Sequence, residues 1–260
     1  MKLSRRLALT IEYDGTNYQG FQLQSNQPTI QGELEKALES LTQESIRVRG
    51  ASRTDSGAHA LGQVVDFKVN SNLSTDQFIK GLNFYLPNDI GIQSAHDVPE
   101  EFNARRNALT RIYRFNILNL QMPSPLKRLT HHWIKEFLDI DIMCEAAKEL
   151  IGSRDFRHIA ANYPKEINTI RTVTRWEIWR EQETIIIESE ANGFLRHQIR
   201  RVNSILVNIG KGKWTKNILR DALVAGFPLG WKPPSLPAKG LCLMKVTYPD
   251  TWQKAEHETY

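Results

Sequence analysis

The 260-residue sequence contains only two cysteines, Cys144 and Cys242, which lie far apart and form no Cys-x-x-Cys pair. Their scarcity excludes a disulfide framework and a zinc ribbon, and it suits a reducing compartment. No apolar run approaches the roughly 18 residues that a membrane span needs. The basic start of the chain is not followed by the apolar core of a signal peptide. We therefore expect a cytoplasmic protein with no membrane partner.

Common cofactor and metal motifs are also missing. The segment Gly210-Lys211-Gly212-Lys213-Trp214 lacks the spacing of a phosphate-binding Walker loop, and no Gly-x-Gly-x-x-Gly follows an expected strand. His131-His132 has no His-Glu-x-x-His context, and the seven histidines do not cluster with carboxylates at metal-ligand spacing. We therefore expect chemistry that needs neither a metal nor an organic cofactor.

The charge is unevenly distributed. Residues 1–103 contain 9 Lys and Arg against 13 Asp and Glu, a net of −4, whereas residues 104–220 contain 21 against 12, a net of +9. A basic block inside an ordered region suggests a polyanionic partner, because phosphates attract Lys and Arg and release counterions. A solvated basic face explains the same charge, so this observation alone leaves nucleic acid binding open.

The order of the expected elements indicates an α+β fold. Residues 1–103 predict a strand at Leu7–Tyr13, a helix after the N-cap Thr29, strands at Ile46–Ala51 and Gln63–Val69, a helix from Ser74 or Thr75 to before Pro87, and a strand at Ile90–Val98. This β-α-β-β-α-β order is the ferredoxin-like arrangement.

Residues 104–260 repeat the order more loosely. They predict strands at Arg111–Leu118, Val173–Trp179, Thr184–Glu190 and Leu241–Tyr248, and helices at Asp139–Ile151, Phe194–Ile209 and Thr215–Ala225. We expect residues 1–103 and 104–260 to form two ferredoxin-like halves joined into one mixed, mainly antiparallel sheet. The helices would cover one face, and an RNA-binding cleft would cross the other.

The segment Gly50–Ala60 presents an arginine, a carboxylate and a histidine, Arg53, Asp55 and His59, on one loop between two expected strands. Loops on a rigid scaffold often carry catalytic and binding groups. Asp-Ser-Gly is also ordinary turn chemistry. An aspartate side chain is ionised at neutral pH and can act as nucleophile or base, although in a cleft it would need a cation beside it.

Two basic segments supply such cations. Residues 102–115 carry four arginines and no acid, with Tyr113 and Phe115 interleaved, as base stacking and phosphate contact require. Residues 192–206 predict a helix that places Arg196 and Arg200 on one face. Further basic residues run from Lys211 to Arg220, and the sequence assigns them no role. Each segment alone is equally compatible with solvated surface arginines.

Taken together, these segments resemble the tRNA pseudouridine synthase A (TruA) family. The similarity covers nearly the whole chain. Its most specific part is Arg53-Thr54-Asp55-Ser56-Gly57-Ala58-His59 followed by Gly62-Gln63-Val64-Val65. Supporting blocks follow in the same order: 11–22, 29–38, 102–105, 111–115, 191–200 and 238–243.

The resemblance implies a role for each matching residue. Asp55 corresponds to the aspartate that attacks the target nucleotide, and Arg53 to the arginine that helps to expel the base from its stack. Tyr113 corresponds to the tyrosine that stacks on the base, Arg200 to the cation paired with the catalytic carboxylate, and Leu241 or Leu243 to the apolar wall. The remaining predicted substrate-binding residues are Arg105, Arg111, Arg196 and His59.

The resemblance further implies uridines 38, 39 and 40 of the tRNA anticodon stem-loop as substrates, and a homodimer. One departure from the family pattern is Asp155-Phe156-Arg157-His158, where Ser or Thr and then Ser or Ala more often follow Phe. It implies altered RNA contacts rather than altered chemistry. The alternatives are a catalytically silent RNA-binding protein and a synthase for a different RNA. An acid/base hydrolase is disfavoured because the loop has no second carboxylate.

Overall fold

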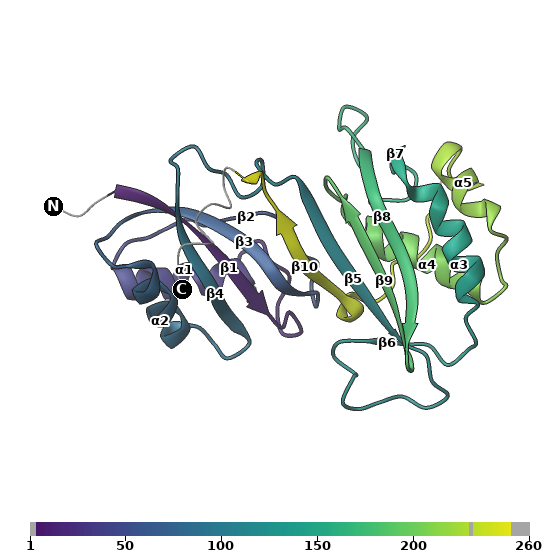
Figure 1. Cartoon of the computed structure of the whole chain (residues 1–260), viewed down its shortest axis with the longest axis horizontal. Coiled ribbons are helices and arrows are strands. Elements are labelled where there is room, and N and C mark those ends of the chain that lie inside the picture. Colours follow the sequence, from purple (N-terminus) through teal and green to yellow (C-terminus); the bar gives the residue numbers. More distant parts are fainter. Residues whose placement is uncertain (1–3, 229–230, 251–260) are drawn as a thin grey trace. The chain divides into compact units, whose positions relative to one another are not determined.

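The computed structural model describes residues 4–228 and 231–250, which form ten strands and five α-helices (Figure 1). The predicted α+β class is confirmed. Contacts divide the chain into two compact units, Met1–Thr110 with Leu243–Tyr260, and Arg111–Cys242. The division differs from the expected one at residue 103, because residues 104–110 and the chain from Leu243 belong with the N-terminal unit.

Four strands of the N-terminal unit lie where the sequence predicts strands, and part of a fifth comes from the C-terminal segment. They are β1 (Ser4–Tyr13), β2 (Arg49–Gly50), β3 (His59–Asn70), β4 (Ile90–Val98) and the part of β10 (Leu241–Thr247) from Leu243 onward. β1 pairs antiparallel with both β3 and β4, and β2 pairs antiparallel with β3. The expected strand Ile46–Ala51 is reduced to two residues, because only Arg49 and Gly50 pair with β3.

Two capped helices pack on this sheet. α1 (Ile30–Thr42) begins after Thr29, whose side chain accepts the Gly32 N–H, and α2 (Thr75–Tyr85) begins with a capping box formed by Ser74 and Gln77. Such caps satisfy backbone N–H groups that the first helical turn leaves unpaired. The ring of Phe78 on α2 lies 6.2 Å from that of Phe67 on β3, and both side chains are fully buried.

The other side of β3 carries a buried carboxylate. Asp66 accepts hydrogen bonds from Arg6 Nη1 at 2.6 Å, from Arg49 Nε at 3.1 Å and from the Ala104 N–H at 2.9 Å. Its side chain is fully buried. It therefore joins β1, β2, β3 and the segment after Phe102 through charge-assisted bonds, which are stronger than neutral ones.

The C-terminal unit has the longer connections. Its strands are β5 (Thr110–Leu118), β6 (His132–Trp133), β7 (Gly152–Asp155), β8 (Ile170–Glu181) and β9 (Thr184–Ala191). β9 pairs antiparallel with β5 and β8, β7 pairs antiparallel with β8, and β6 runs parallel to β5. The short strands β6 and β7 were not predicted, because two or four paired residues leave no alternation in the sequence.

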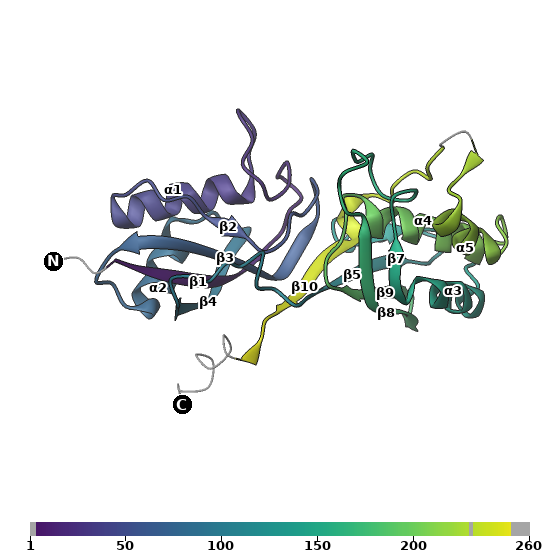
Figure 2. The same ribbon diagram turned by 90° about the horizontal axis from the view of Figure 1, so that it is seen from above.

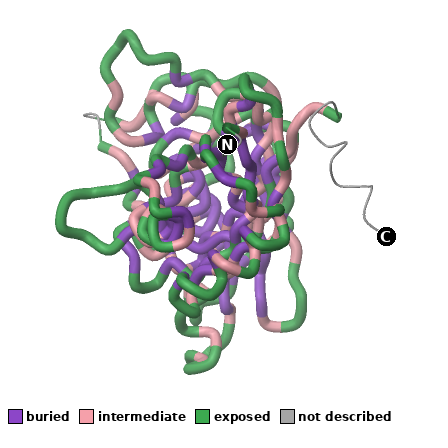
Figure 3. The backbone as a smooth tube through the Cα atoms, turned by 90° about the vertical axis from the view of Figure 1, so that its left-hand side faces the viewer, coloured by how far each residue is buried: buried purple, intermediate pink, exposed green. Residues whose placement is uncertain are grey.

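Three helices cover this unit: α3 (Ile140–Ala147), α4 (Gln198–Gly210) and α5 (Asn217–Val224). They lie on the same side of β8 and β9 in both ribbon views (Figure 2). Short 3-10 turns occur at Lys148–Leu150 and Ala238–Gly240. α4 starts four residues later than the expected Phe194, because His197 adopts a left-handed conformation with φ 64°. Figure 3 shows that many exposed residues lie in the outlying loops.

We predict that Asp66→Asn lowers the free energy of unfolding by about 3 kcal/mol, because it removes the buried counter-charge of Arg6 and leaves that arginine only the exposed Glu100. Urea unfolding followed by circular dichroism measures this difference. Glu100→Gln is the control, since Glu100 is an exposed partner of Arg6 and Lys68. An equal loss in both variants would contradict a special role for Asp66.

We also predict a pH-dependent contribution from His132. Burial first, and then the charges of Lys239 and Lys211, lower the pKa of His132 from 6.5 to about 4. As the pH falls from about 6.5 to about 4, the unfolded chain gains a proton on His132 that the folded chain does not, so stability decreases. In His132→Gln, unfolding measured across this range should lose stability less steeply than the wild type. Identical slopes would contradict the shifted pKa.

Candidate functional site

The loop that carries Asp55 is held at its start by a buried amide. Gln63, on β3, is fully buried. Its side chain accepts the Ser52 N–H at 3.2 Å and donates to the Ser52 carbonyl at 2.7 Å. The Ala51 N–H also donates to the Val64 carbonyl at 2.8 Å. These bonds continue the β2–β3 pairing into the loop, so its first residues have a fixed position.

The middle of the loop is packed against the segment after β1. The buried Thr54 hydroxyl lies 2.8 Å from the Tyr13 hydroxyl, and the Thr54 carbonyl accepts the Phe21 N–H at 3.2 Å. Gly20 has φ +90°, and a Cβ there would lie 2.7 Å from the Thr54 carbonyl oxygen. A larger residue at position 20 would therefore push against the backbone next to Asp55.

Asp55 begins a tight turn, which confirms the turn predicted from Asp-Ser-Gly. Its carbonyl accepts the Ala58 N–H at 3.0 Å, and Gly57, with φ +77°, donates its N–H to the Tyr18 carbonyl at 3.3 Å. The Asp55 side chain is half-buried, and Arg53 is exposed. The carboxylate therefore stands on a short loop whose backbone is bonded on both sides of it.

His59 anchors the end of the loop. It is buried, and its Nδ1 lies 3.2 Å from the Gly15 N–H donor and 3.1 Å from Asp14 Oδ1. Burial tends to raise the pKa of Asp14, but hydrogen bonds from Thr16 and the interaction with His59 lower it overall. These contacts support a positioning role for His59. Its predicted contact with substrate stays a prediction.

Two other predicted residues of the N-terminal unit differ in exposure. Arg105 is exposed, and its backbone N–H donates to the Asn103 side chain at 3.1 Å. Leu243, on β10, has no exposed side-chain surface. Arg105 can therefore contact a ligand directly. Leu243 could form an apolar wall only if the residues that cover it moved apart.

In the C-terminal unit, Tyr113 lies on β5 with its ring among aromatic neighbours. Its exposed fraction is 4%. The Phe194 ring meets it edge-on at 5.5 Å, and Trp176 lies 6.3 Å from Phe194. Tyr113 and Phe115 share the buried face of β5. A base that stacked on Tyr113 would have to displace part of this packing.

The arginines predicted in this unit have different surroundings. Arg111 is buried and donates to the Asn192 carbonyl at 2.9 Å. Arg200, in the first turn of α4, donates from Nε to the Leu236 carbonyl at 2.6 Å, which fixes the direction of its guanidinium group. Arg196 is exposed, and its backbone N–H donates to the Tyr163 hydroxyl at 2.8 Å.

The predicted residues are thus divided between the two units. Those of the N-terminal unit are Arg53, Asp55, His59, Arg105 and Leu243, and those of the C-terminal unit are Arg111, Tyr113, Arg196, Arg200 and Leu241. Sequence reasoning assigned no role to Gln63 or Thr54, which hold the Asp55 loop. A glutamine at an inward position of an apolar strand was the available signal for Gln63.

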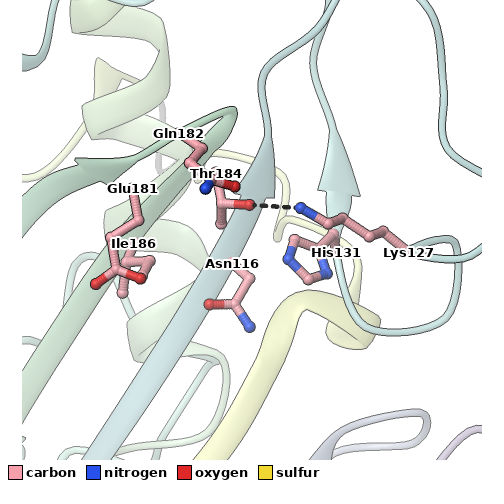
Figure 4. Close-up of a pocket in the computed structure, with 7 residues that line it drawn as sticks. All are labelled: Asn116, Lys127, His131, Glu181, Gln182, Thr184 and Ile186. Atoms are coloured by element: carbon pink, nitrogen blue, oxygen red, sulfur yellow. Dashed lines mark hydrogen bonds between the residues drawn. The ribbon is translucent and has the colours of Figure 1, made fainter.

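A separate pocket of about 600 Å³ lies in the C-terminal unit (Figure 4). It is lined by Asn116, Lys127, His131, Glu181, Gln182, Thr184 and Ile186. Lys127 Nζ donates to the Thr184 hydroxyl at 3.2 Å. Burial, and then the charge of Lys127, lower the pKa of His131. The pocket shares no residue with the predicted site.

Within residues 4–228 and 231–250, no three His, Cys, Asp or Glu side chains lie together in a group that could hold a metal ion. No helix of that part of the chain combines the length and apolarity that a membrane crossing requires.

Comparisons with known proteins identify the family. The family model described as tRNA pseudouridine synthase matches residues 9–105 and 146–249. The tRNA pseudouridine synthase A of Roseiflexus castenholzii is 41% identical over 251 residues, 95% of this chain and 92% of that protein. That of Geotalea daltonii is 37% identical over 244 residues, 94% of this chain and 100% of that protein.

A solved structure titled Crystal Structure of a Cbf5-Nop10-Gar1 Complex matches weakly, at 10% identity and a TM-score of 0.34, over 92% of this chain and 49% of that one. The family model and the sequence relatives show the family by themselves. The chain belongs to the tRNA pseudouridine synthase family, whose members are isomerases.

Proposed function

We propose that this enzyme converts uridine to pseudouridine at positions 38, 39 and 40 of the tRNA anticodon stem-loop, with Asp55 as the nucleophile. The observation that carries the proposal is the Asp55 loop. It lies inside the family-matched range 9–105. Hydrogen bonds from Gln63 to Ser52 and between Tyr13 and Thr54 fix the residues that precede Asp55. A nucleophile works only when it is held in position for attack, and this loop meets that requirement.

The chemistry needs one carboxylate and no cofactor. A carboxylate oxygen of Asp55 attacks either the ribose C1′ or the base C6, and both routes stay open. The bond between N1 and C1′ breaks, the uracil rotates, and C5 forms the new bond to C1′. The hydrogen on C5 leaves as a proton to solvent, N1 takes up a proton from solvent, and the carboxylate is regenerated. The sum is an isomerisation, with no atom gained or lost.

The target uridine must leave its stack before Asp55 can reach it, because the glycosidic carbon is inaccessible inside a helix. In our proposal Arg53, which is exposed, helps to expel the base. Tyr113 then stacks on it, and Phe194, which contacts the Tyr113 ring edge-on, yields to make room. Leu243 or Leu241 supplies an apolar wall.

The other arginines have separate proposed roles. Arg200 neutralises the catalytic carboxylate, and its bond to the Leu236 carbonyl supports this by limiting its motion. The exposed Arg105 and Arg196 contact the RNA directly. Arg111, which is buried and bonded to the Asn192 carbonyl, acts through the strand that it stabilises. Like His59, it is better suited to positioning than to contact.

The assembly and location belong to the same proposal. We propose a homodimer, from the family resemblance, and a cytoplasmic enzyme. Within the described part of the chain, Cys144 and Cys242 form no disulfide, which suits a reducing compartment.

We predict that Asp55→Asn lowers the rate of pseudouridine formation at least about 10³-fold, because the neutral amide removes the nucleophile. Release of tritium from tRNA labelled at uridine C5 measures the rate. The dissociation constant for tRNA should change less than about threefold, since the side-chain shape is kept. Asp76→Asn, an exposed aspartate on α2, is the control. An active Asp55→Asn enzyme would exclude Asp55 as the nucleophile, whereas a wild type that binds tRNA but releases no tritium would identify a silent RNA-binding protein.

We predict that Gly20→Ala lowers the same rate on the order of 10- to 100-fold, because displacement of the Thr54 carbonyl misplaces the nucleophile. Gly212→Ala is the matched control. Gly212 also has positive φ, at +68°, but a Cβ there meets nothing within 4 Å. Equal effects of the two variants would show that backbone strain alone, rather than the position of the loop, sets the rate.

A further inference from the structure

Two cations of the C-terminal unit share one carbonyl group, and a third, Arg157, lies close enough to act on the pKa of Lys232. Lys232 Nζ donates to the carbonyl oxygens of Ala160 at 2.6 Å and Arg157 at 2.8 Å. Arg201 Nη1 donates to the carbonyl oxygens of Ala160 at 2.7 Å and Ile159 at 3.1 Å. Because Lys232 and Arg201 share the Ala160 oxygen, their charges lie side by side. We call Arg157, Arg201 and Lys232 the cation cluster.

The cation cluster has little negative charge to balance it. Among the described residues, none of its three members forms an ion pair with a carboxylate; their side chains donate to neutral carbonyls instead. Asp155 is the nearby acid, and it is engaged by the Arg157 backbone N–H at 2.9 Å and the Thr169 hydroxyl at 2.6 Å. Burial, and then the charges of Arg201 and Arg157, lower the pKa of Lys232.

The neighbouring helix increases this excess. Arg200 and Arg201 occupy the first turn of α4, which contains no acidic residue. The N-terminus of a helix carries partial positive charge, so cations there are unfavourable and an anion is favourable. Burial, and then the charge of Arg200, lower the pKa of Arg201. This arrangement costs stability in the free protein, and a bound anion would offset the cost.

We propose that the cation cluster binds phosphates of the tRNA backbone, a contact that rests on the proposed function. All three side chains are half-exposed, so a ligand can reach them. Arginine and lysine recognise phosphate by charge-assisted hydrogen bonds. Arg157 stands where the family resemblance leads us to expect Ser or Thr, so the contact distinguishes this chain.

A purely structural role is the competing explanation. Arg157 donates to the carbonyls of Pro164 at 3.0 Å and Ile167 at 2.7 Å, and so helps to hold the segment 157–167. A structural tether contributes to folding stability and does not respond to salt as an RNA contact does. The salt dependence of tRNA binding therefore separates the two roles.

The experiment compares Lys232→Gln and Arg157→Ser with Lys80→Gln, a control that removes one exposed charge from α2. The dissociation constant for unmodified tRNA is measured at several salt concentrations, together with the melting temperature of each variant. We expect each cluster variant to weaken binding and to reduce the slope of log affinity against log salt by about 1, because each removes one phosphate contact. Lys80→Gln should leave the slope unchanged, and Lys232→Arg should restore it.

Slopes equal to that of Lys80→Gln would overturn the proposal, and a lowered melting temperature with an unchanged slope would identify a tether. The loss should appear in KM rather than in the turnover number at saturating tRNA, since a phosphate contact made equally in the bound and transition states affects binding alone. If the slopes change as expected but the wild type forms no pseudouridine, the proposed function fails while the phosphate contact stands. If Asp55→Asn is inactive but the slopes do not change, the proposed function stands and the phosphate contact fails.

Discussion

The buried amide of Gln63 is the contact on which the Asp55 loop depends. It both donates to and accepts from the backbone of Ser52, so it satisfies two polar groups and fixes the loop where it leaves β2. A buried side chain that lost these partners would leave unpaired polar groups, which costs free energy. The hydroxyl pair of Tyr13 and Thr54 then holds the residue directly before Asp55. The position of Asp55, the proposed nucleophile, thus depends on hydrogen bonds made by the residues that precede it in the loop.

Glycine completes this arrangement from the outside. The segment after β1 packs closely on the loop, and Gly20 allows its backbone to pass the Thr54 carbonyl without a side chain between them. His59 and Gly15 fasten the far end. In the proposed mechanism, a carboxylate positioned in this way needs little reorganisation to attack, and this lowers the barrier.

Local signals in the sequence predicted much of the fold. Thr29 and Ser74 cap their helices as expected, because capping depends only on neighbouring residues. The start of α4 could not be predicted, since the left-handed conformation of His197 delays the helix to Gln198 although the apolar pattern begins earlier. β6 and β7 are too short to produce a pattern, and their pairing depends on strands distant in the sequence.

The sequence offered candidate residues for the site but not the contacts that support them. The loop motif drew attention to Asp55, whose role stays a prediction, whereas Gln63 bonds to Ser52 only because β2 and β3 pair in one register. Charge counting likewise could not separate arginines bonded to carbonyls, such as Arg111 and Arg201, from exposed ones such as Arg105. That distinction depends on which carbonyls the fold brings within hydrogen-bonding distance.

The most direct test of the account is to map pseudouridine in an unmodified tRNA after incubation with the purified wild-type protein alone, by a chemical method that marks each pseudouridine. The account predicts pseudouridine at uridines 38, 39 and 40, with no added metal or cofactor, and at no other position. Pseudouridine elsewhere in the tRNA, or none at these positions, would contradict it.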